Sequence, residues 1–139
     1  MLGDSLSAAY GIKPAQGWVA LLQKRLQDQG YGQRVVNASV SGETSSGGLQ
    51  RLPRALQLHK PGIVIIELGS NDGLRGLPLS VTRDTLSKMV AAWKKAGAEV
   101  LLVGMQMPPN YGTRYTAEFA ALFRELASRN SLALVPFLL

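Results

Sequence analysis

Residues 63–68, Ile-Val-Ile-Ile-Glu-Leu, decide the fold class because all but one of them are apolar. A strand that is apolar on both faces is covered on both sides, and such strands are typical of parallel sheets. A second run, Val-Leu-Leu-Val at residues 100–103, has the same character. The two runs therefore predict the central strands of a parallel sheet.

Segments with helical periodicity alternate with these apolar runs. Apolar side chains recur at the spacing of one helix face, and in the first segment they are Trp18, Leu21, Leu22 and Leu26. Strands that alternate with helices are typical of a doubly wound α/β sandwich, and 139 residues suit a single domain. The predicted helices are 17–29, a segment ending near 58, 80–96 and 115–130; the other predicted strands are 34–38 and 132–135; the predicted loops include 69–78 and 105–113.

The composition excludes several classes of protein. The chain has no cysteine and one histidine, which excludes disulfide scaffolds, Cys-ligated metal centres and multi-histidine metal sites. The net charge is +6, but the basic residues are scattered, which is typical of a solvated surface rather than a nucleic-acid interface. No apolar run reaches the roughly 18 residues of a membrane span, and no signal peptide is recognisable. We therefore expect no metal or other cofactor, no nucleic-acid partner and no stable membrane anchor.

Three glycine-bearing segments follow predicted strands. Ser5 lies in Gly-Asp-Ser-Leu, Gly42 in Ser-Gly-Glu-Thr, and Asn71 in Gly-Ser-Asn-Asp-Gly. Loops at the carboxyl ends of parallel strands share one edge of the sheet, so these segments should converge. A serine at such a turn can act as a nucleophile, with the Gly42 N–H and the Asn71 amide donating to an oxyanion. Taken singly, the first motif could equally cap a helix and the other two could be ordinary turns.

Together the three motifs resemble those of the SGNH superfamily of GDSL-type hydrolases. Longer segments at 4–11, 36–45, 67–76 and 108–112 are similar to the bacterial periplasmic acyl-CoA thioesterase/lysophospholipase/arylesterase subfamily. The resemblance covers essentially the whole chain. It implies the SGNH hydrolase fold, a flavodoxin-like three-layer α/β/α sandwich with a parallel sheet, and a periplasmic or secreted location.

The resemblance also implies a catalytic apparatus, of which one part is missing from the sequence. It implies an acyl-enzyme on Ser5 and an oxyanion hole formed by the N–H groups of Ser5 and Gly42 and the side chain of Asn71. It further implies a triad His and Asp in an Asp-x-x-His motif, which the 139 residues do not contain. His59 precedes the strand at 63–68, at the end opposite the motif loops. We therefore expect a single domain, 1–139, that lacks most of the first strand, the Asp-x-x-His loop and a final helix, and that is nearly inactive alone.

The expected activity is hydrolysis of acyl esters and thioesters: aryl esters, lysophospholipids and acyl-CoA. Leu74, Pro108 and Tyr111 lie in loops and could contact the acyl chain, or could equally be packing or surface residues. The resemblance implies local structural hydrogen bonds for Asp4 and Asp72. The alternatives are a carbohydrate acetylesterase of the same superfamily and a non-catalytic acyl-binding fragment. A nucleotide binder is disfavoured because the phosphate-binding glycine motifs are missing.

Overall fold

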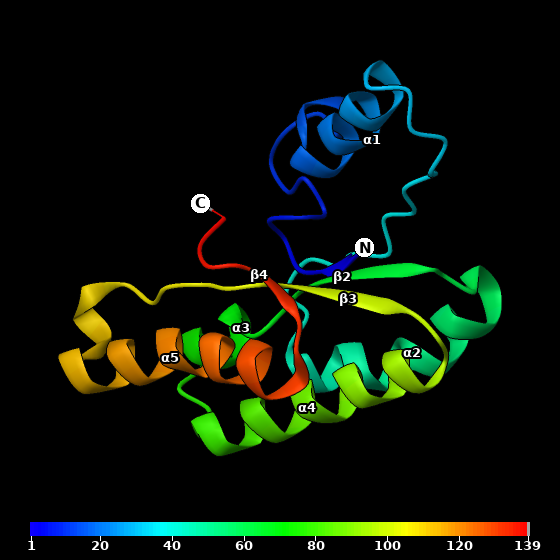
Figure 1. The fold of residues 1–139 in the computed structure, drawn as a ribbon. Coiled ribbons are helices and arrows are strands. Elements are labelled where there is room, and N and C mark those ends of the chain that lie inside the picture. The colour runs from blue at the N-terminus through cyan, green and yellow to red at the C-terminus, as the bar shows by residue number, and fades with distance from the viewer. Residues whose placement is uncertain (139) are drawn as a thin grey trace.

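The computed structural model describes residues 1–138 and contains a sheet of four parallel strands (Figure 1). In spatial order the strands are β1 (Leu2–Gly3), β2 (Ile63–Glu67), β3 (Glu99–Val103) and β4 (Ala133–Val135). Ile66 pairs with Leu2 on one side and with Leu102 on the other. The prediction that the two apolar runs form the central strands of a parallel sheet is confirmed.

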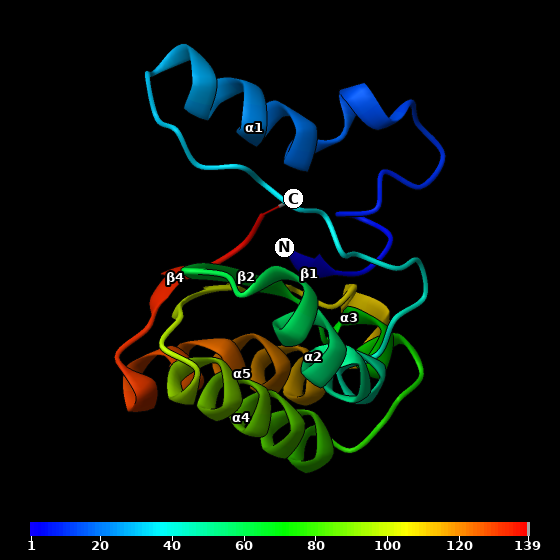
Figure 2. The ribbon, with the colours of Figure 1, turned by 90° about the vertical axis from the view of Figure 1, so that its right-hand side faces the viewer.

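Helices lie on both faces of the sheet, which confirms the α/β/α sandwich. Helices α2 (Ser45–His59), α4 (Leu79–Lys95) and α5 (Thr113–Asn130) cover one face, and α1 (Trp18–Asp28) lies on the other (Figure 1, Figure 2). No helix within residues 1–138 is long and apolar enough to cross a membrane. The other helical elements are the short helix α3 (Ser70–Leu74) and the 3₁₀ turns η1 (Pro14–Gln16) and η2 (Pro109–Tyr111).

The main core fills the space between the sheet and helices α2, α4 and α5. Alternate residues of a strand point to the same face, and Ile66 and Leu102 are buried on this one. Trp93 of α4 is buried in the same core, as its helical spacing predicts. Phe119 and Phe123 of α5 pack edge to face with ring centres 5.3 Å apart. The two central strands are therefore fully covered on the face that carries α2, α4 and α5.

The opposite face of the sheet is only partly covered. Ile63 is 56% exposed, and Ile65 and Leu101 are half-buried. A cavity of about 820 Å³ lies between this face and α1, lined in part by Leu22 and Leu26. The two-sided coverage predicted for β2 is therefore incomplete, because the helix on this face stands off the strands.

The apolar face predicted for α1 is only partly buried, and its Leu22 and Leu26 are half-buried. Val19 is buried, but Leu21 is 53% exposed and Trp18 is only half-buried. Hydrogen bonds attach α1 to the next segment: the Gln23 Oε1 accepts from the Val35 N–H at 2.6 Å. Leu21 therefore faces solvent, because this side of α1 does not reach the sheet.

The strand predicted at residues 34–38 is not a regular strand in the structure. The segment nevertheless runs beside β1 and exchanges backbone hydrogen bonds with Met1. The Met1 amino group donates to the Val36 carbonyl at 2.8 Å, and the Ala38 N–H donates to the Met1 carbonyl at 2.9 Å. Because β1 is only two residues long, it provides too short a ladder for a regular strand to form beside it.

Candidate active site

The chain leaves β1 in a tight turn at residues 4–10, which we call the Ser5 loop. Asp4 is buried, and its Oδ1 accepts a hydrogen bond from the Leu6 N–H at 3.0 Å. The Ala8 N–H donates to the Asp4 carbonyl at 2.9 Å, and the Tyr10 N–H donates to the Ser5 carbonyl at 3.2 Å. These bonds close the turn around Ser5, which stays partly exposed.

A short helix, α3, replaces part of the loop predicted at residues 69–78. Gly69 has a φ of +119°, a value that glycine adopts without strain, and it turns the chain from β2 into α3. A Cβ at Gly69 would lie 3.2 Å from the Phe123 Cζ. The sharp turn lets α3 begin directly at the end of β2, with Asn71 in its first turn.

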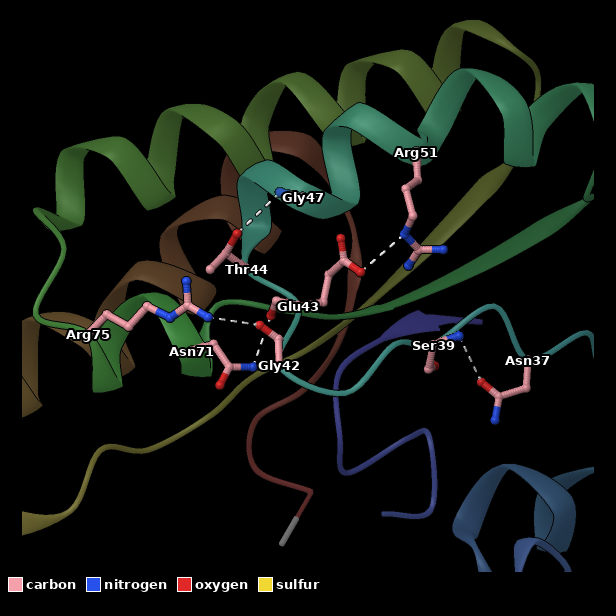
Figure 3. Close-up of polar contacts among 9 residues, drawn as sticks. All are labelled: Asn37, Ser39, Gly42, Glu43, Thr44, Gly47, Arg51, Asn71 and Arg75. Atoms are coloured by element: carbon pink, nitrogen blue, oxygen red, sulfur yellow. Dashed lines mark hydrogen bonds and ion pairs between the residues drawn. The ribbon is translucent and has the colours of Figure 1, made fainter.

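Hydrogen bonds join the three predicted segments at one edge of the sheet. The Asn71 Nδ2 donates to the Glu43 carbonyl at 2.9 Å, beside Gly42 (Figure 3). The Asp4 Oδ2 accepts a hydrogen bond from the Ser70 Oγ at 2.5 Å and lies 3.5 Å from the Asn71 Nδ2. The Ser5 loop and the segments of Gly42 and Asn71 therefore meet beyond the carboxyl ends of β1 and β2.

The loop that holds Gly42 is fixed from two helices. Gly42 is exposed and has a φ of +80°, in the left-handed region that favours glycine. The Arg75 guanidinium, at the end of α3, donates to the Gly42 carbonyl at 3.3 Å (Figure 3). The Thr44 Oγ1 caps α2 by accepting a hydrogen bond from the Gly47 N–H at 3.2 Å. The conformation of Gly42 is thus held between α2 and α3.

Asp72 connects three helices, a wider role than the local one that the resemblance implies. Its Oδ1 accepts from the Ser45 N–H at 2.8 Å, and its Oδ2 accepts from the Ser45 Oγ at 2.5 Å and the Thr82 Oγ1 at 2.9 Å. All three residues are buried. Ser45 begins α2 and Thr82 lies in α4, so Asp72 holds both helices against α3.

Glu67 is a buried acid that the sequence analysis did not assign to the site. Its Oε1 accepts a hydrogen bond from the Ser7 Oγ at 2.5 Å, and the Ser7 Oγ accepts one from the Trp18 Nε1 at 3.1 Å. Burial raises the pKa of Glu67 to about 8, the Ser7 hydrogen bond acts against this rise, and the nearby Asp4 carboxylate adds to it. The sequence contains one sign of this role: Glu67 is the single charged residue in the apolar run 63–68.

The three predicted acyl-contact residues lie together beside α3. The Tyr111 hydroxyl donates to the Leu74 carbonyl at 3.2 Å. The Tyr111 N–H donates to the Pro108 carbonyl at 3.1 Å. Leu74 is 49% exposed, and Pro108 is also exposed. Exposed apolar groups thus flank α3, and their contact with an acyl chain stays a prediction.

His59 lies far from the motif loops. It is exposed in the last turn of α2, just before β2, whereas Ser70 follows the carboxyl end of that strand. Five strand residues separate the two ends, a span of about 17 Å. The one histidine of the chain therefore cannot reach Ser5. Among residues 1–138, no group of three acidic or histidine side chains could hold a metal ion.

The assembled groups have the chemistry of an acyl-transfer site. The Ser5 hydroxyl is partly exposed, and the Gly42 backbone lies in an exposed loop. The Asn71 Nδ2 carries two N–H groups, and it donates to the Glu43 carbonyl at 2.9 Å and, over a longer 3.5 Å, to the Asp4 Oδ2. Such donors can stabilise the negative oxygen of a tetrahedral intermediate. The catalytic roles of Ser5, Gly42 and Asn71 stay predictions.

The sequence matches the GDSL-like lipase/acylhydrolase family over residues 1–139. It is 54% identical to the esterase TesA of Pseudomonas aeruginosa, covering 100% of this chain and 69% of that protein. It is 45% identical to thioesterase 1/protease 1/lysophospholipase L1 of Escherichia coli K12, covering 99% of this chain and 64% of that protein. The chain is thus shorter than these curated relatives.

Solved structures agree with this assignment. The crystal structure of TesA has a TM-score of 0.95 and 54% identity, covering 98% of this chain and 76% of that chain. AlinE4, an SGNH-hydrolase family esterase, has a TM-score of 0.93 and 39% identity, covering 98% of this chain and 73% of that chain. The chain therefore has the SGNH hydrolase fold and belongs to the GDSL-like lipase/acylhydrolase family.

Proposed function

We propose that this chain carries the nucleophile and the oxyanion hole of a serine hydrolase that acts on acyl esters and thioesters. The observation that carries the proposal is the 2.9 Å hydrogen bond from the Asn71 Nδ2 to the Glu43 carbonyl, because it fixes Asn71 beside Gly42. The names of the relatives support the substrate class: an esterase, an arylesterase and a thioesterase/lysophospholipase are 45–54% identical to the chain.

In the proposed reaction the Ser5 Oγ attacks the acyl carbonyl carbon and gives its proton to a general base. The carbonyl oxygen becomes an oxyanion, which the Ser5 N–H, the Gly42 N–H and the Asn71 Nδ2 stabilise. Collapse of this intermediate breaks the bond to the alcohol or thiol, which takes up the proton, and leaves the acyl group on Ser5. Water then attacks the acyl-enzyme, releases the carboxylic acid and restores the Ser5 hydroxyl.

We further propose that the chain by itself does not perform triad catalysis. A serine hydroxyl is a weak nucleophile at neutral pH and needs an adjacent base. His59 lies at the opposite end of β2. Both carboxylate oxygens of Asp4, the nearest acid along the chain, already accept hydrogen bonds from Leu6 and Ser70. Without a general base, only the weaker contribution of oxyanion donors and binding is left.

Leu74, Pro108 and Tyr111 are the proposed contacts for the acyl chain. The position of these residues supports the proposal, because they lie at α3, the helix that also carries Asn71. Leu74 offers an exposed apolar side chain, and the Tyr111 hydroxyl is already bound to the Leu74 carbonyl, which leaves its ring to pack. Changing these residues should alter the preference for acyl length more than the rate on acetyl esters.

The test is hydrolysis of p-nitrophenyl esters and acyl-CoA by the 139-residue chain and by the product of the full gene. Ser5→Ala should abolish turnover by the full product without changing its far-ultraviolet circular dichroism. Ser80→Ala, an exposed serine in the first turn of α4, is the matched control and should keep full activity. A Ser5→Ala protein with most of its activity would refute the nucleophile assignment. Equal turnover by the short chain and the full product would refute the proposed inactivity.

A further inference from the structure

Glu67 stands at the end of β2, directly against the Ser5 loop. It pairs in register with Gly3 of β1. A Cβ at Gly3 would lie 2.7 Å from the Ser7 Oγ, so a side chain at Gly3 would collide with Ser7. The glycine thus leaves room for Ser7 to reach Glu67, and their 2.5 Å hydrogen bond joins residues 60 positions apart in the sequence.

Ser7 is the point at which the Ser5 loop is tied to the rest of the fold. Its Oγ donates to Glu67 and accepts from the Trp18 Nε1 of α1 at 3.1 Å. Its backbone carbonyl accepts a hydrogen bond from the Asn37 Nδ2 at 2.8 Å. Ser7 itself is 1% exposed. Of these partners only Glu67 can change its charge in the physiological range.

The surroundings of Glu67 favour the neutral acid. Its Oε2 is buried and accepts no hydrogen bond from any donor among residues 1–138. A charged oxygen in that position would lose its hydration without compensation, whereas a protonated one supplies a donor. Burial raises the pKa of Glu67 to about 8, and Asp4 raises it further by its charge and by a side-chain hydrogen bond, against the opposing effect of Ser7.

Asp4 is buried and directly follows Gly3, the register partner of Glu67, and its charge is the one in the Ser5 loop that acts on Glu67. The Met1 amino group is a second titratable group at β1, but it binds the Val36 carbonyl instead. From α1, the group that reaches Glu67 is the neutral indole of Trp18, through Ser7. Ionisation of Glu67 would therefore place two carboxylates side by side, with no cation to offset them among these groups.

We propose that Glu67, as a neutral acid, is a positioning residue for Ser5: its O–H donates to the Asp4 carboxylate while its Oε1 accepts from Ser7. The same Asp4 carboxylate binds Leu6 in the loop and Ser70 next to Asn71. Glu67 thus fixes the Ser5 loop and the Asn71 segment relative to each other. It is not a catalytic base, because it holds its proton and contacts Ser7 rather than Ser5. The inference rests on the proposed function only for the role of Ser5.

The test is a pH titration, from 6 to 10, of the ¹H–¹⁵N spectrum of the chain. The indole N–H of Trp18 reports on Ser7 and so on Glu67. Its resonance should shift with a midpoint near 8, the value to which burial raises the pKa of Glu67. In Glu67→Gln it should stay close to its low-pH position throughout. The indole of Trp93, buried in the main core, is the internal control and should not move.

Two further variants separate positioning from general stability. Ser7→Ala removes the link and should abolish the Trp18 shift with Glu67 still present. Glu67→Leu should displace the amide resonances of Leu6 and Ala8, whereas Glu67→Gln should keep them near the wild-type positions. If Glu67→Leu does not fold, the Gln and Ser7 variants alone decide.

The inference is overturned if Trp18 does not titrate in the wild-type chain, or if it titrates equally in Glu67→Gln. None of these spectra needs turnover. A failed Ser5 assignment therefore leaves the Trp18 titration intact, and a failed Glu67 inference leaves the esterase assay intact.

Discussion

Asp72→Ala removes the acceptor of three buried hydrogen bonds from Ser45 and Thr82. The Ser45 N–H cannot turn to another acceptor, and an unsatisfied buried donor costs about 1–3 kcal/mol. The two hydroxyls can rotate, so we assign each roughly 1 kcal/mol, the usual net contribution of a hydrogen bond. The expected loss is about 3–5 kcal/mol, a large part of the roughly 5–15 kcal/mol by which domains are stable.

Urea unfolding followed by circular dichroism measures this loss directly. Asp72→Asn keeps one oxygen for the Ser45 N–H and should lose only about 1–2 kcal/mol, near one to two hydrogen bonds. Asp84→Ala is the control, because the Asp84 side chain is 66% exposed and pairs with Lys88 on the surface of α4 at 3.0 Å. Such a pair contributes about 0–1 kcal/mol. If Asp72→Ala and Asp84→Ala unfold at the same urea concentration, the reasoning about the buried acceptor is wrong.

Three further predictions concern the site. Gly42→Ala should lower the free energy of unfolding by about 1–2 kcal/mol, the cost of an alanine in the left-handed conformation. No steric cost is added, because no atom lies within 4 Å of the new Cβ. Gly32→Ala, which is equally open but has no positive φ, should cost less, and equal losses in the two variants would contradict this reasoning. Asn71→Ala in the full gene product should raise the acylation barrier by about 2.7–4 kcal/mol, as for other oxyanion donors; an unchanged kcat would exclude Asn71 from the oxyanion hole. Glu67 in the folded chain keeps its proton up to about pH 8, whereas in the unfolded chain it loses the proton near pH 4.5. The free energy of unfolding should therefore fall by about 1.4 kcal/mol per pH unit between these two values. Glu67→Gln should lack this slope, and an identical slope in the variant would exclude Glu67 as its source.

The fold could be predicted where a local pattern determines the structure. The apolar run that became β2 has no other plausible place than the centre of a sheet, and Trp93 is buried as its helical spacing indicates. The segment at 34–38 has strand-like residues, but its partner β1 offers only two residues to pair with. The apolar residues of α1 follow a helical pattern too, yet Leu21 is exposed. These outcomes depend on neighbouring elements, which periodicity does not describe.

The site divides in the same way. Ser5, Gly42 and Asn71 lie in motifs, and parallel strands bring their loops to one edge, so their convergence could be predicted. Asp72 was recognised, but its partners Ser45 and Thr82 lie 27 and 10 residues away along the chain. Glu67 is a single acid in an apolar strand, and its structural role depends on the Ser7 hydroxyl, 60 residues earlier in the chain. Contacts of this range follow from packing, which no local motif records.

The stand-off of α1 has a consequence for how the molecule opens. With Val19 as its one buried residue and a cavity beneath it, α1 has little apolar contact to lose on detachment, so its amide protons should exchange with solvent through a partial unfolding that leaves α4 and α5 closed. That excursion would break the bond from Trp18 to Ser7. The Ser5 loop would lose this hydrogen bond each time α1 detaches from the sheet. The stability of α1, the least stable part of the fold, would therefore determine what fraction of the time the Ser5 loop is fully ordered.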